Sequence, residues 1–292
     1  MLKLALRNLV RQRGRTLITL AAIVFGVAGL IVSGGFISDL LDQLGEAVIH
    51  SQTGHLQIAR RGFRDEGARR PERYSIAEPD RLTARLRSLP EVDDAMGRLD
   101  FSAVLNNGRT DLAIVGEGIE PDREARLGHS MRLTAGRRLT AADAHGAMIG
   151  QGLAHALRLA PGDRATLVTS TGAGAVNTAD VEVVGVFQTF SKDYDARAIK
   201  VPLAVAQQLL DTEGASTLVV ALKRTEDTQR AGAALKVMLK DDYEIATWQE
   251  LNDFHSKTVT LYERQFGVLQ LIILLTVMLS VANSVNMSVS ER

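Results

Sequence analysis

The chain has 292 residues, with 34 lysine or arginine and 34 aspartate or glutamate side chains, so its formal net charge is zero. Five basic residues precede residue 16, which leaves the rest of the chain acidic and argues against nucleic acid as a partner, because phosphate binding needs a positive surface. The absence of cysteine excludes disulfides, thiolate metal sites and cysteine nucleophiles.

Two uncharged apolar runs, Thr16 to Ser38 and Gln265 to Ser290, enclose a long charged segment. A helix rises about 1.5 Å per residue, so each run can cross a hydrocarbon core of about 30 Å. Core helices of soluble proteins usually keep one polar face, which these runs lack. A cleaved signal peptide is the alternative for the first run, although its apolar part usually spans only about 7 to 15 residues. We therefore predict transmembrane helices at 16–38 and 265–290.

The flanks of the first run predict its orientation. The segment before it contains only basic charges, at Lys3, Arg7, Arg11, Arg13 and Arg15. The segment after it opens with acidic residues. Lysine and arginine stay on the cytoplasmic side and are attracted to anionic lipid. We expect 1–15 to be a cytoplasmic basic segment, either an amphipathic helix at the membrane surface or a simple positive anchor. Residues 39–264 are then extracytoplasmic, and 291–292 are cytoplasmic.

Helical spacing continues beyond both predicted spans. Apolar residues recur with a helical period at Leu40, Leu41, Leu44 and Val48 after the first span, and at Trp248, Leu251, Phe254, Thr258 and Leu261 before the second. We call these two segments stalks, and we expect them to join the extracytoplasmic domain to the membrane.

Between the stalks, the pattern predicts a mixed α+β domain. The Asn107-Gly108 pair within 101–115 is a strong hairpin signal. Further strands are expected at 55–58, 165–169, 181–187 and 218–222, and 146–157 is expected to be a strand followed by a helix. Helices are also expected at 80–88, 203–210 and 228–239. Residues 60–73 are expected to form an arginine-rich solvated loop, and 170–175 a flexible loop.

Catalytic motifs are missing from this sequence. It has no P-loop, no Gly-x-Ser-x-Gly elbow and no His-Glu-x-x-His stretch, so ATP-driven work must come from another subunit. His50 and His55 are separated by Gly54 and do not share a helix face, which indicates a loop and strand rather than a metal site. Asp193 and Asp195 are expected to be solvated in a polar turn. We predict no enzyme, no cofactor and no catalytic or metal site.

Small and polar residues occur four positions apart within both predicted spans. They are the pairs Ala22 and Gly26, and Gly29 and Ser33, in the first span, and Ser280, Ser284 and Ser288, with Asn283 beside them, in the second. In a membrane, this spacing lets helices approach closely and form hydrogen bonds. The alternative for Ser288 is a place at the hydrated cytoplasmic end. We predict that both helices pack against partner helices.

Several short motifs occur in an order typical of one family. They are Leu-Ala-Leu-Arg-Asn-Leu at 4–9, Gly-His-Leu-Gln-Ile at 54–58, Leu-Ala-Pro-Gly-Asp at 159–163, Val-Val-Gly-Val-Phe at 183–187 and Val-Pro-Leu at 201–203. With the flanking spans, they cover essentially the whole chain. The sequence resembles the MacB and FtsX type of ABC transporter permease, and most of all its lipoprotein-releasing LolC and LolE branch.

This resemblance implies a multi-pass protein of the bacterial inner membrane, with a MacB-like periplasmic core domain. Such permeases have four spans, pair with a second permease subunit as a homodimer or heterodimer, and bind an ABC ATPase. A cytoplasmic coupling helix follows the second span, and Glu291 and Arg292 would begin it. The sequence ends there, so we expect either a longer parent chain or a short relative.

The resemblance also implies mechanical transport. ATP hydrolysis in the partner would move the stalks and shift the periplasmic domain, so that a lipoprotein is released to a periplasmic acceptor or another hydrophobic cargo is exported. The alternative is a membrane-anchored sensor or scaffold of the cell envelope. Further apolar runs after Arg292, or a neighbouring ATPase gene, would favour the permease.

Overall fold

The computed structural model describes residues 13–67, 71–127, 131–189 and 191–290. The chain divides into two compact units. One contains most of the long helix α2 (Arg13–Val48) together with the long helix α11 (Asp253–Ser290), and the other is the domain formed by residues 45–252. We describe each unit by itself.

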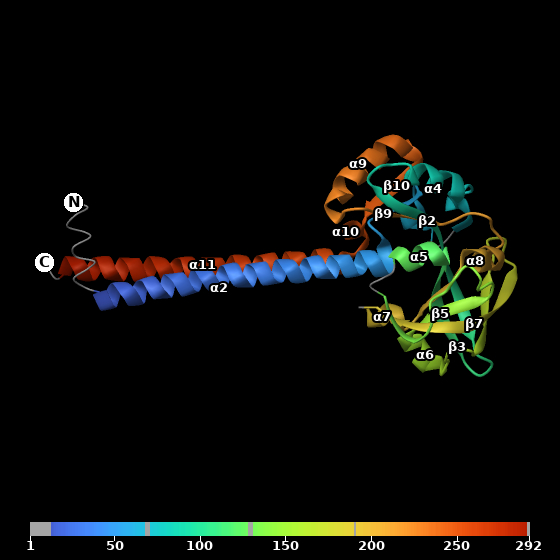
Figure 1. Ribbon diagram of the computed structural model, residues 1–292, viewed down its shortest axis with the longest axis horizontal. Coiled ribbons are helices and arrows are strands. Elements are labelled where there is room, and N and C mark those ends of the chain that lie inside the picture. The colour runs from blue at the N-terminus through green and yellow to red at the C-terminus, as the bar shows by residue number, and fades with distance from the viewer. Residues whose placement is uncertain (1–12, 68–70, 128–130, 190, 291–292) are drawn as a thin grey trace. The chain divides into compact units, whose positions relative to one another are not determined.

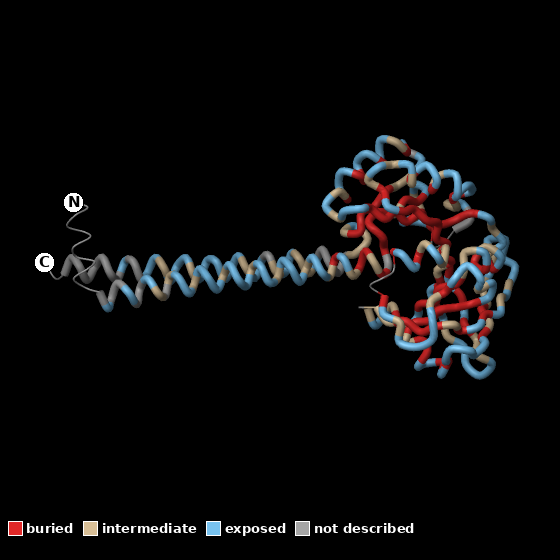
Figure 2. Tube along the Cα trace, viewed as in Figure 1, coloured by how far each residue is buried: buried red, intermediate tan, exposed pale blue. Residues whose placement is uncertain are grey.

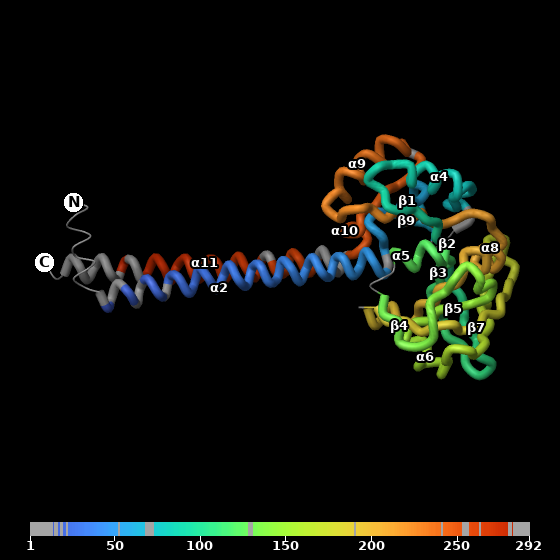
Figure 3. Tube along the Cα trace, in the orientation of Figure 1, coloured from blue at the N-terminus to red at the C-terminus, as the bar shows by residue number. Residues whose placement is uncertain are grey.

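In the helical unit, α2 and α11 lie side by side and run in opposite directions (Figure 3). A Cβ atom built on Gly26 would lie 3.7 Å from Ile273 Cγ2, so the two helices are in contact there. The stretches Ile23–Ser51 and Lys257–Leu279 are long and apolar enough to cross a membrane. Large apolar side chains such as Phe25 are exposed along α2, which suits a lipid environment (Figure 2).

The first helix continues beyond its apolar part without a break. At about 1.5 Å per residue, α2 is about 54 Å long, against about 30 Å for a hydrocarbon core. The expectation that the first helix continues through Val48 is therefore confirmed.

The second stalk is not one helix as expected. Trp248–Leu251 forms the separate short helix α10, and the chain is extended at Asn252 before α11 begins. Thr247 and Glu250 form a reciprocal capping box that starts α10 at this position, which explains why the helical period of the sequence is divided.

The domain contains ten strands with the order β10-β1-β9-β2-β3-β8-β5-β7-β4, and β6 pairs with both β2 and β7 (Figure 1). The strands are β1 (Leu56–Arg60), β2 (Val92–Asn106), β3 (Asp111–Ile119), β4 (Arg132–Gly136), β5 (Gly146–Gly150), β6 (Arg164–Ser170), β7 (Val176–Gln188), β8 (Ala198–Pro202), β9 (Thr217–Leu222) and β10 (Tyr243–Thr247). The longer helices of the domain are α4 (Pro79–Arg87), α5 (Pro121–Leu127), α6 (Gln151–Leu157), α8 (Leu203–Leu210) and α9 (Thr228–Leu239).

Strand β2 belongs to two sheets. Its first half, from Val92 to Arg98, pairs with β9 in a small sheet formed by β10, β1, β9 and β2. Its second half, from Leu99 to Asn106, pairs with β3. Because β6 pairs with both β2 and β7, the strands β2, β3, β8, β5, β7 and β6 close into a barrel. Arg98 therefore lies where β2 passes from the small sheet to the barrel.

Each half of the domain has its own core. The small sheet packs against α4 and α9 through buried side chains such as Leu86 and Leu235. The barrel core includes Leu105 and Leu167 and receives side chains from α6 and α8. Burial is thus concentrated inside two lobes that share β2 (Figure 2).

Most expected elements are confirmed, including the hairpin at Asn107-Gly108 and the helices at 203–210 and 228–239. Residues 60–73 are not only loop, because they include the short helix α3 (Phe63–Glu66). Strand β2 begins at Val92 rather than near residue 101. Nearly all of its residues from Val92 to Leu99 are buried, on both faces, so the apolar and polar alternation that identifies a strand is absent there.

We expect Gly54→Ala to destabilise the domain by about 2 to 3 kcal/mol. Gly54 has φ +66° and ψ −176°, a combination that essentially only glycine adopts, and an added Cβ would lie 2.3 Å from Val219 Cγ1. Gly108→Ala is the matched control, because Gly108 also has positive φ but nothing within 4 Å, so its loss should be about 1 kcal/mol. Thermal unfolding of the detergent-solubilised chain measures both, and equal losses would contradict this explanation.

Candidate functional site

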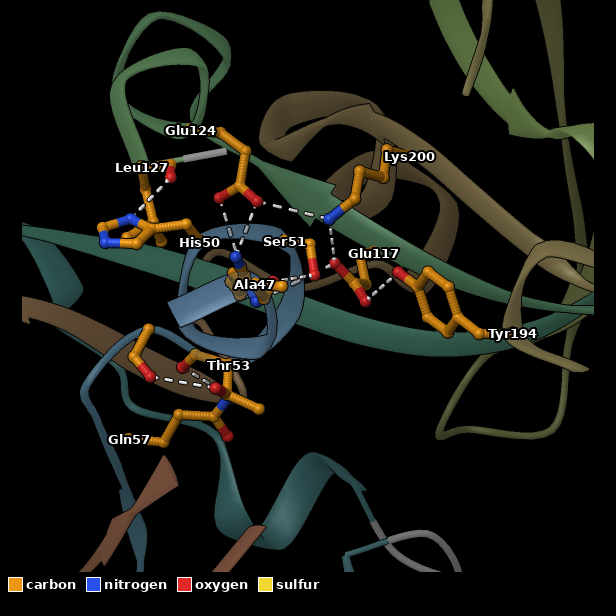
Figure 4. Close-up of polar contacts among 12 residues, drawn as sticks. Ala47, His50, Ser51, Thr53, Gln57, Glu117, Glu124, Leu127, Tyr194 and Lys200 are labelled. Carbon is orange, nitrogen blue, oxygen red and sulfur yellow. Dashed lines mark hydrogen bonds and ion pairs between the residues drawn. The ribbon is translucent and has the colours of Figure 1, made fainter. Parts of the chain in front are cut away.

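Four charged side chains, three of them buried and one half-buried, meet where the two lobes of the domain join. Figure 4 labels three of them, Glu117, Glu124 and Lys200. Lys200 on β8 donates from Nζ to Glu117 Oε2 at 2.5 Å and to Glu124 Oε1 at 3.2 Å. Arg98 on β2 donates to both carboxylate oxygens of Glu124, at 2.6 and 3.2 Å. Tyr194 on the short helix α7 (Lys192–Asp195) donates its hydroxyl to Glu117 Oε1 at 2.6 Å. We call these five residues the ionic network.

The charges of the network balance, with two cations and two carboxylates. Burial alone would raise the pKa of Glu117, but Lys200 and Arg98 hold that pKa at about 2. The pKa of Glu124 is lowered by the same two cations against the effect of burial. Burial and the neighbouring Glu117 hold the pKa of Tyr194 well above its usual value, so its hydroxyl remains a donor. Both carboxylates are therefore ionised at neutral pH.

The segment around Tyr194 differs from expectation. It is a helical turn in which Asp193 is exposed, as expected, whereas Asp195 is buried. Asp195 accepts hydrogen bonds from the Thr189 backbone N–H at 3.0 Å and from the Thr189 hydroxyl at 2.9 Å. These nearby donors compensate the carboxylate for its lost hydration, which explains its burial.

A further carboxylate lies beside the network without a cation of its own. Asp100 on β2 stands directly opposite Glu117 on β3 in the antiparallel register. Burial raises the pKa of Asp100 to about 6, and repulsion from Glu117 adds to the shift, whereas Arg98 and Lys200 oppose it. Like charges at directly opposed positions destabilise a strand pair, so this site is sensitive to the protonation of Asp100.

The end of α2 forms the second part of the site. The helix passes into the π-helical turn η1 (Ile49–Thr53), which Gly54 terminates. His50 on this turn lies 3.2 Å from Glu46 through Nε2 and 3.1 Å from the carbonyl oxygen of Leu127 through Nδ1. Leu127 ends α5, the helix that carries Glu124 of the network.

His55 joins the same cluster from the start of β1. Its ring contacts that of His50 edge to face, with centroids 5.7 Å apart, so the two histidines are closer than their sequence spacing suggested. The Leu222 N–H donates to His55 Nδ1, while His55 Nε2 lies 3.1 Å from the Thr225 hydroxyl oxygen, which in turn donates to Glu46 at 2.6 Å. Burial lowers the pKa of His55 to about 4, and the neighbouring His50 adds to the shift, so His55 is neutral at physiological pH.

Trp248 fixes the last turn of α2 from another side. A Cβ built on Gly45 would lie 2.6 Å from Trp248 Cη2, so the indole ring packs directly against the helix backbone. The backbone N–H of Trp248 donates to the His55 carbonyl oxygen. The end of α2 is therefore held by α10, by the loop after β9 and by α5.

The two cations and two carboxylates of the network neutralise one another. Among the described residues, no three histidine, aspartate or glutamate side chains are grouped so that they could hold a metal ion. A cleft of about 800 Å³ lies elsewhere in the domain, between the β2–β3 hairpin, β6, β7 and α8, and none of the network residues lines it.

The residues singled out from the sequence lie mainly in or near the two long helices. Gly26 contacts α11, Gly29 has nothing within 4 Å, and Ser33 is exposed. Lys3, Arg7, Arg11, Glu291 and Arg292 lie outside the described residues, and the side chains of Arg13, Arg15, Ala22, Ser280, Asn283, Ser284 and Ser288 are not among those described. Their assigned roles in membrane anchoring, helix packing and ATPase coupling stay predictions.

Sequence reasoning did not identify the ionic network. One signal was available, because Lys200 stands between two apolar residues, Ile199 and Val201, and a charge in apolar surroundings needs a buried partner. Its partners are distant in sequence, so the pattern of one segment could not reveal them.

Comparisons with known proteins agree on the domain. The sequence profile of the MacB-like periplasmic core domain matches residues 16–237. The structure is similar to the periplasmic region of MacB from Actinobacillus actinomycetemcomitans, with a TM-score of 0.50 and 16% identity over 73% of this chain and 95% of that chain. It is also similar to the extracellular domain of the noncanonic ABC-type transporter YknZ from Gram-positive bacteria, with a TM-score of 0.47 and 16% identity over 66% of this chain and 99% of that one.

A comparison with curated protein sequences gives no significant match. The matches found do not distinguish a lipoprotein-releasing branch. Together with the two long apolar helices, they show the expected fold class, in which a helical membrane part flanks a large mixed α and β domain.

We predict that Asp100→Asn changes the pH dependence of stability. An unfolded chain releases the Asp proton near pH 3.9, whereas the folded chain retains it to about pH 6. Between these values the folded state binds more protons, so the free energy of unfolding of the parent protein falls as pH rises. The free energy of unfolding of the variant should not fall in this way. It should exceed that of the parent by on the order of 2 kcal/mol at neutral pH, and by little below about pH 4.

Thermal unfolding between about pH 4 and pH 8 measures this effect. Asp193→Asn is the control, since Asp193 is an exposed carboxylate in the same region. If the stability of Asp100→Asn fell with rising pH as steeply as that of the parent, the role assigned to Asp100 would be contradicted.

Proposed function

Because this chain belongs to the family with the MacB-like periplasmic core domain, we propose that it is the permease subunit of an ABC transporter. The observation that carries the proposal is the arrangement of this core domain between two helices that are long and apolar enough to span a membrane. The resemblance of its sequence motifs to MacB and FtsX type permeases supports the same function.

The proposed mechanism is mechanical. The continuous helix α2 links the membrane to the domain, and its last turn contacts α5 through His50 and Leu127. Helix α5 carries Glu124, which is bound to Arg98 on β2 and to Lys200 on β8. Movement of α2 would therefore act on the boundary between the two lobes of the domain, where buried ion pairs resist small displacements.

Energy would come from a separate ATPase subunit, because the sequence contains no P-loop. We propose that the permease pairs with a second permease subunit, either identical or related, and that Glu291 and Arg292 begin the segment that contacts the ATPase. The small and polar residues of both spans would pack against the neighbouring helices.

The proposed location is the bacterial inner membrane, with the N-terminus in the cytoplasm and the core domain in the periplasm. The basic residues before residue 16 would contact anionic lipid. The resemblance to LolC and LolE supports a lipoprotein as the cargo, passed to a periplasmic acceptor, with another hydrophobic molecule as the alternative.

Co-purification tests the transporter assignment. We expect a tagged full-length protein, extracted from native membranes with detergent, to recover a P-loop ATPase subunit. An unrelated inner-membrane protein with the same tag serves as control and should recover none. Repeated isolation of the full-length protein without an ATPase would contradict the proposal and favour an envelope sensor or scaffold.

Single cysteines test the orientation, because the native chain has none. We expect Arg109→Cys, at the exposed tip of the β2–β3 hairpin, to react with a membrane-impermeant maleimide added outside spheroplasts. Gly14→Cys should react only after the membrane is permeabilised, because the positive end of a span stays in the cytoplasm. The parent protein is the blank, and the reverse labelling pattern would show the opposite orientation.

A further inference from the structure

Both ring nitrogens of His50 lie close to oxygen atoms that accept hydrogen bonds. Nδ1 lies 3.1 Å from the carbonyl oxygen of Leu127, which can only accept. Nε2 lies 3.2 Å from Glu46 Oε2, a carboxylate oxygen that also only accepts when ionised. A neutral histidine has a single N–H, so one of these two contacts would place a lone pair against an oxygen. Both contacts are favourable together only when His50 is protonated.

Glu46 also has a second partner. Its other oxygen, Oε1, accepts a 2.6 Å hydrogen bond from the Thr225 hydroxyl. The Thr225 oxygen itself faces His55 Nε2, which must carry the proton because His55 Nδ1 accepts from the Leu222 N–H. His55, Thr225 and Glu46 thus form a directed chain of donors that ends on the carboxylate of Glu46.

The other charged groups near His50 are already engaged. On α5, Arg123 and Arg126 face Asp94, Arg123 also faces Glu120, and Glu124 faces Arg98 and Lys200, while Asp122 accepts from the Ala141 N–H. On α10, Glu250 accepts from the Thr247 N–H. Just before β1, His55 is held neutral by burial. Among the described residues, His50 and Glu46 are an ion pair at the contact between the end of α2 and α5.

We propose that His50 is a proton-dependent clamp that fastens the last turn of α2 to α5. When His50 is protonated, it bridges Glu46 of α2 and the carbonyl of Leu127. When it loses its proton, one bridge becomes repulsive and the end of α2 is released from α5. Uptake of a proton by His50 would therefore close the clamp, and loss of the proton would open it.

This clamp would lie outside the cytoplasm, a location that rests on the orientation proposed above. The external pH of a bacterium varies more than its internal pH, so the clamp would tighten the link between α2 and the domain in acid surroundings. The contact itself involves only residues of the domain, and its existence does not depend on a transport function.

Spin labels on the full chain in lipid nanodiscs test the clamp. The chain has no native cysteine, so Asp42→Cys and Ala125→Cys provide one exposed label on α2 and one on α5. We expect the distance distribution between the labels to be narrow at about pH 5.5 and to widen or shift at about pH 8. An unchanged distribution across this range would overturn the proposal.

Three substitutions in this labelled protein test whether His50 and Glu46 cause the pH dependence of the distance distribution. His50→Gln should make the distribution independent of pH, because the amide does not titrate in this range. Glu46→Gln should keep it narrow at both pH values, because an amide can donate to a neutral imidazole and accept from a charged one. His155→Gln removes an exposed histidine and should leave the pH response of the labelled parent unchanged.

Persistence of the pH response in His50→Gln would overturn the proposal and point to another group, such as Asp100. If His50→Gln does not fold, as judged by its circular dichroism, Glu46→Gln still tests the proposal. The proposal fails if the distance distribution of Glu46→Gln widens at about pH 8 as that of the labelled parent does. Loss of ATPase co-purification would contradict the proposed transport function and would leave the clamp intact.

Discussion

The domain depends on the complete pairing of four buried charges. Removing a carboxylate or an ammonium group from water costs several kcal/mol per ion, and this cost is offset only when every charge finds a partner in good geometry. Arg98, Lys200, Glu117 and Glu124 satisfy that condition together and come from β2, β8, β3 and α5. Four segments that are distant in sequence are thereby held in one arrangement, at the place where β2 leaves the small sheet and enters the barrel.

The end of α2 is attached to this arrangement through several different kinds of contact. An indole ring packs against Gly45, a carboxylate accepts from the loop after β9, and an imidazole contacts the end of α5. Helix α5 is only seven residues long, yet it carries both Glu124 and Leu127. The short connection between β3 and β4 therefore lies between the long helix and the charged boundary, which makes it the natural intermediary in the proposed mechanism.

Much of this architecture could be predicted from the sequence, and the failures have physical causes. The hairpin at Asn107-Gly108 and helices such as 203–210 carry local signals of turn chemistry and periodicity, and they are confirmed. The first half of β2 carries no alternation, because both of its faces are buried. Strand β8 is only five residues long and contains the buried Lys200, so its sequence lacks the pattern that predicts an apolar strand. The ionic network depends on contacts between distant segments, which a single sequence does not encode locally.

The two connections of the domain to the long helices differ in kind. On one side, α2 reaches Val48 without interruption, whereas on the other side α10 ends and an extended residue, Asn252, precedes α11. A continuous helix transmits torque about its axis, because every peptide is hydrogen-bonded to the next turn. A single residue outside a helix can change its two backbone dihedrals without breaking a helical hydrogen bond. In the proposed mechanism, α2 would therefore transmit rotation to the domain, whereas the connection at Asn252 would let the domain turn relative to α11.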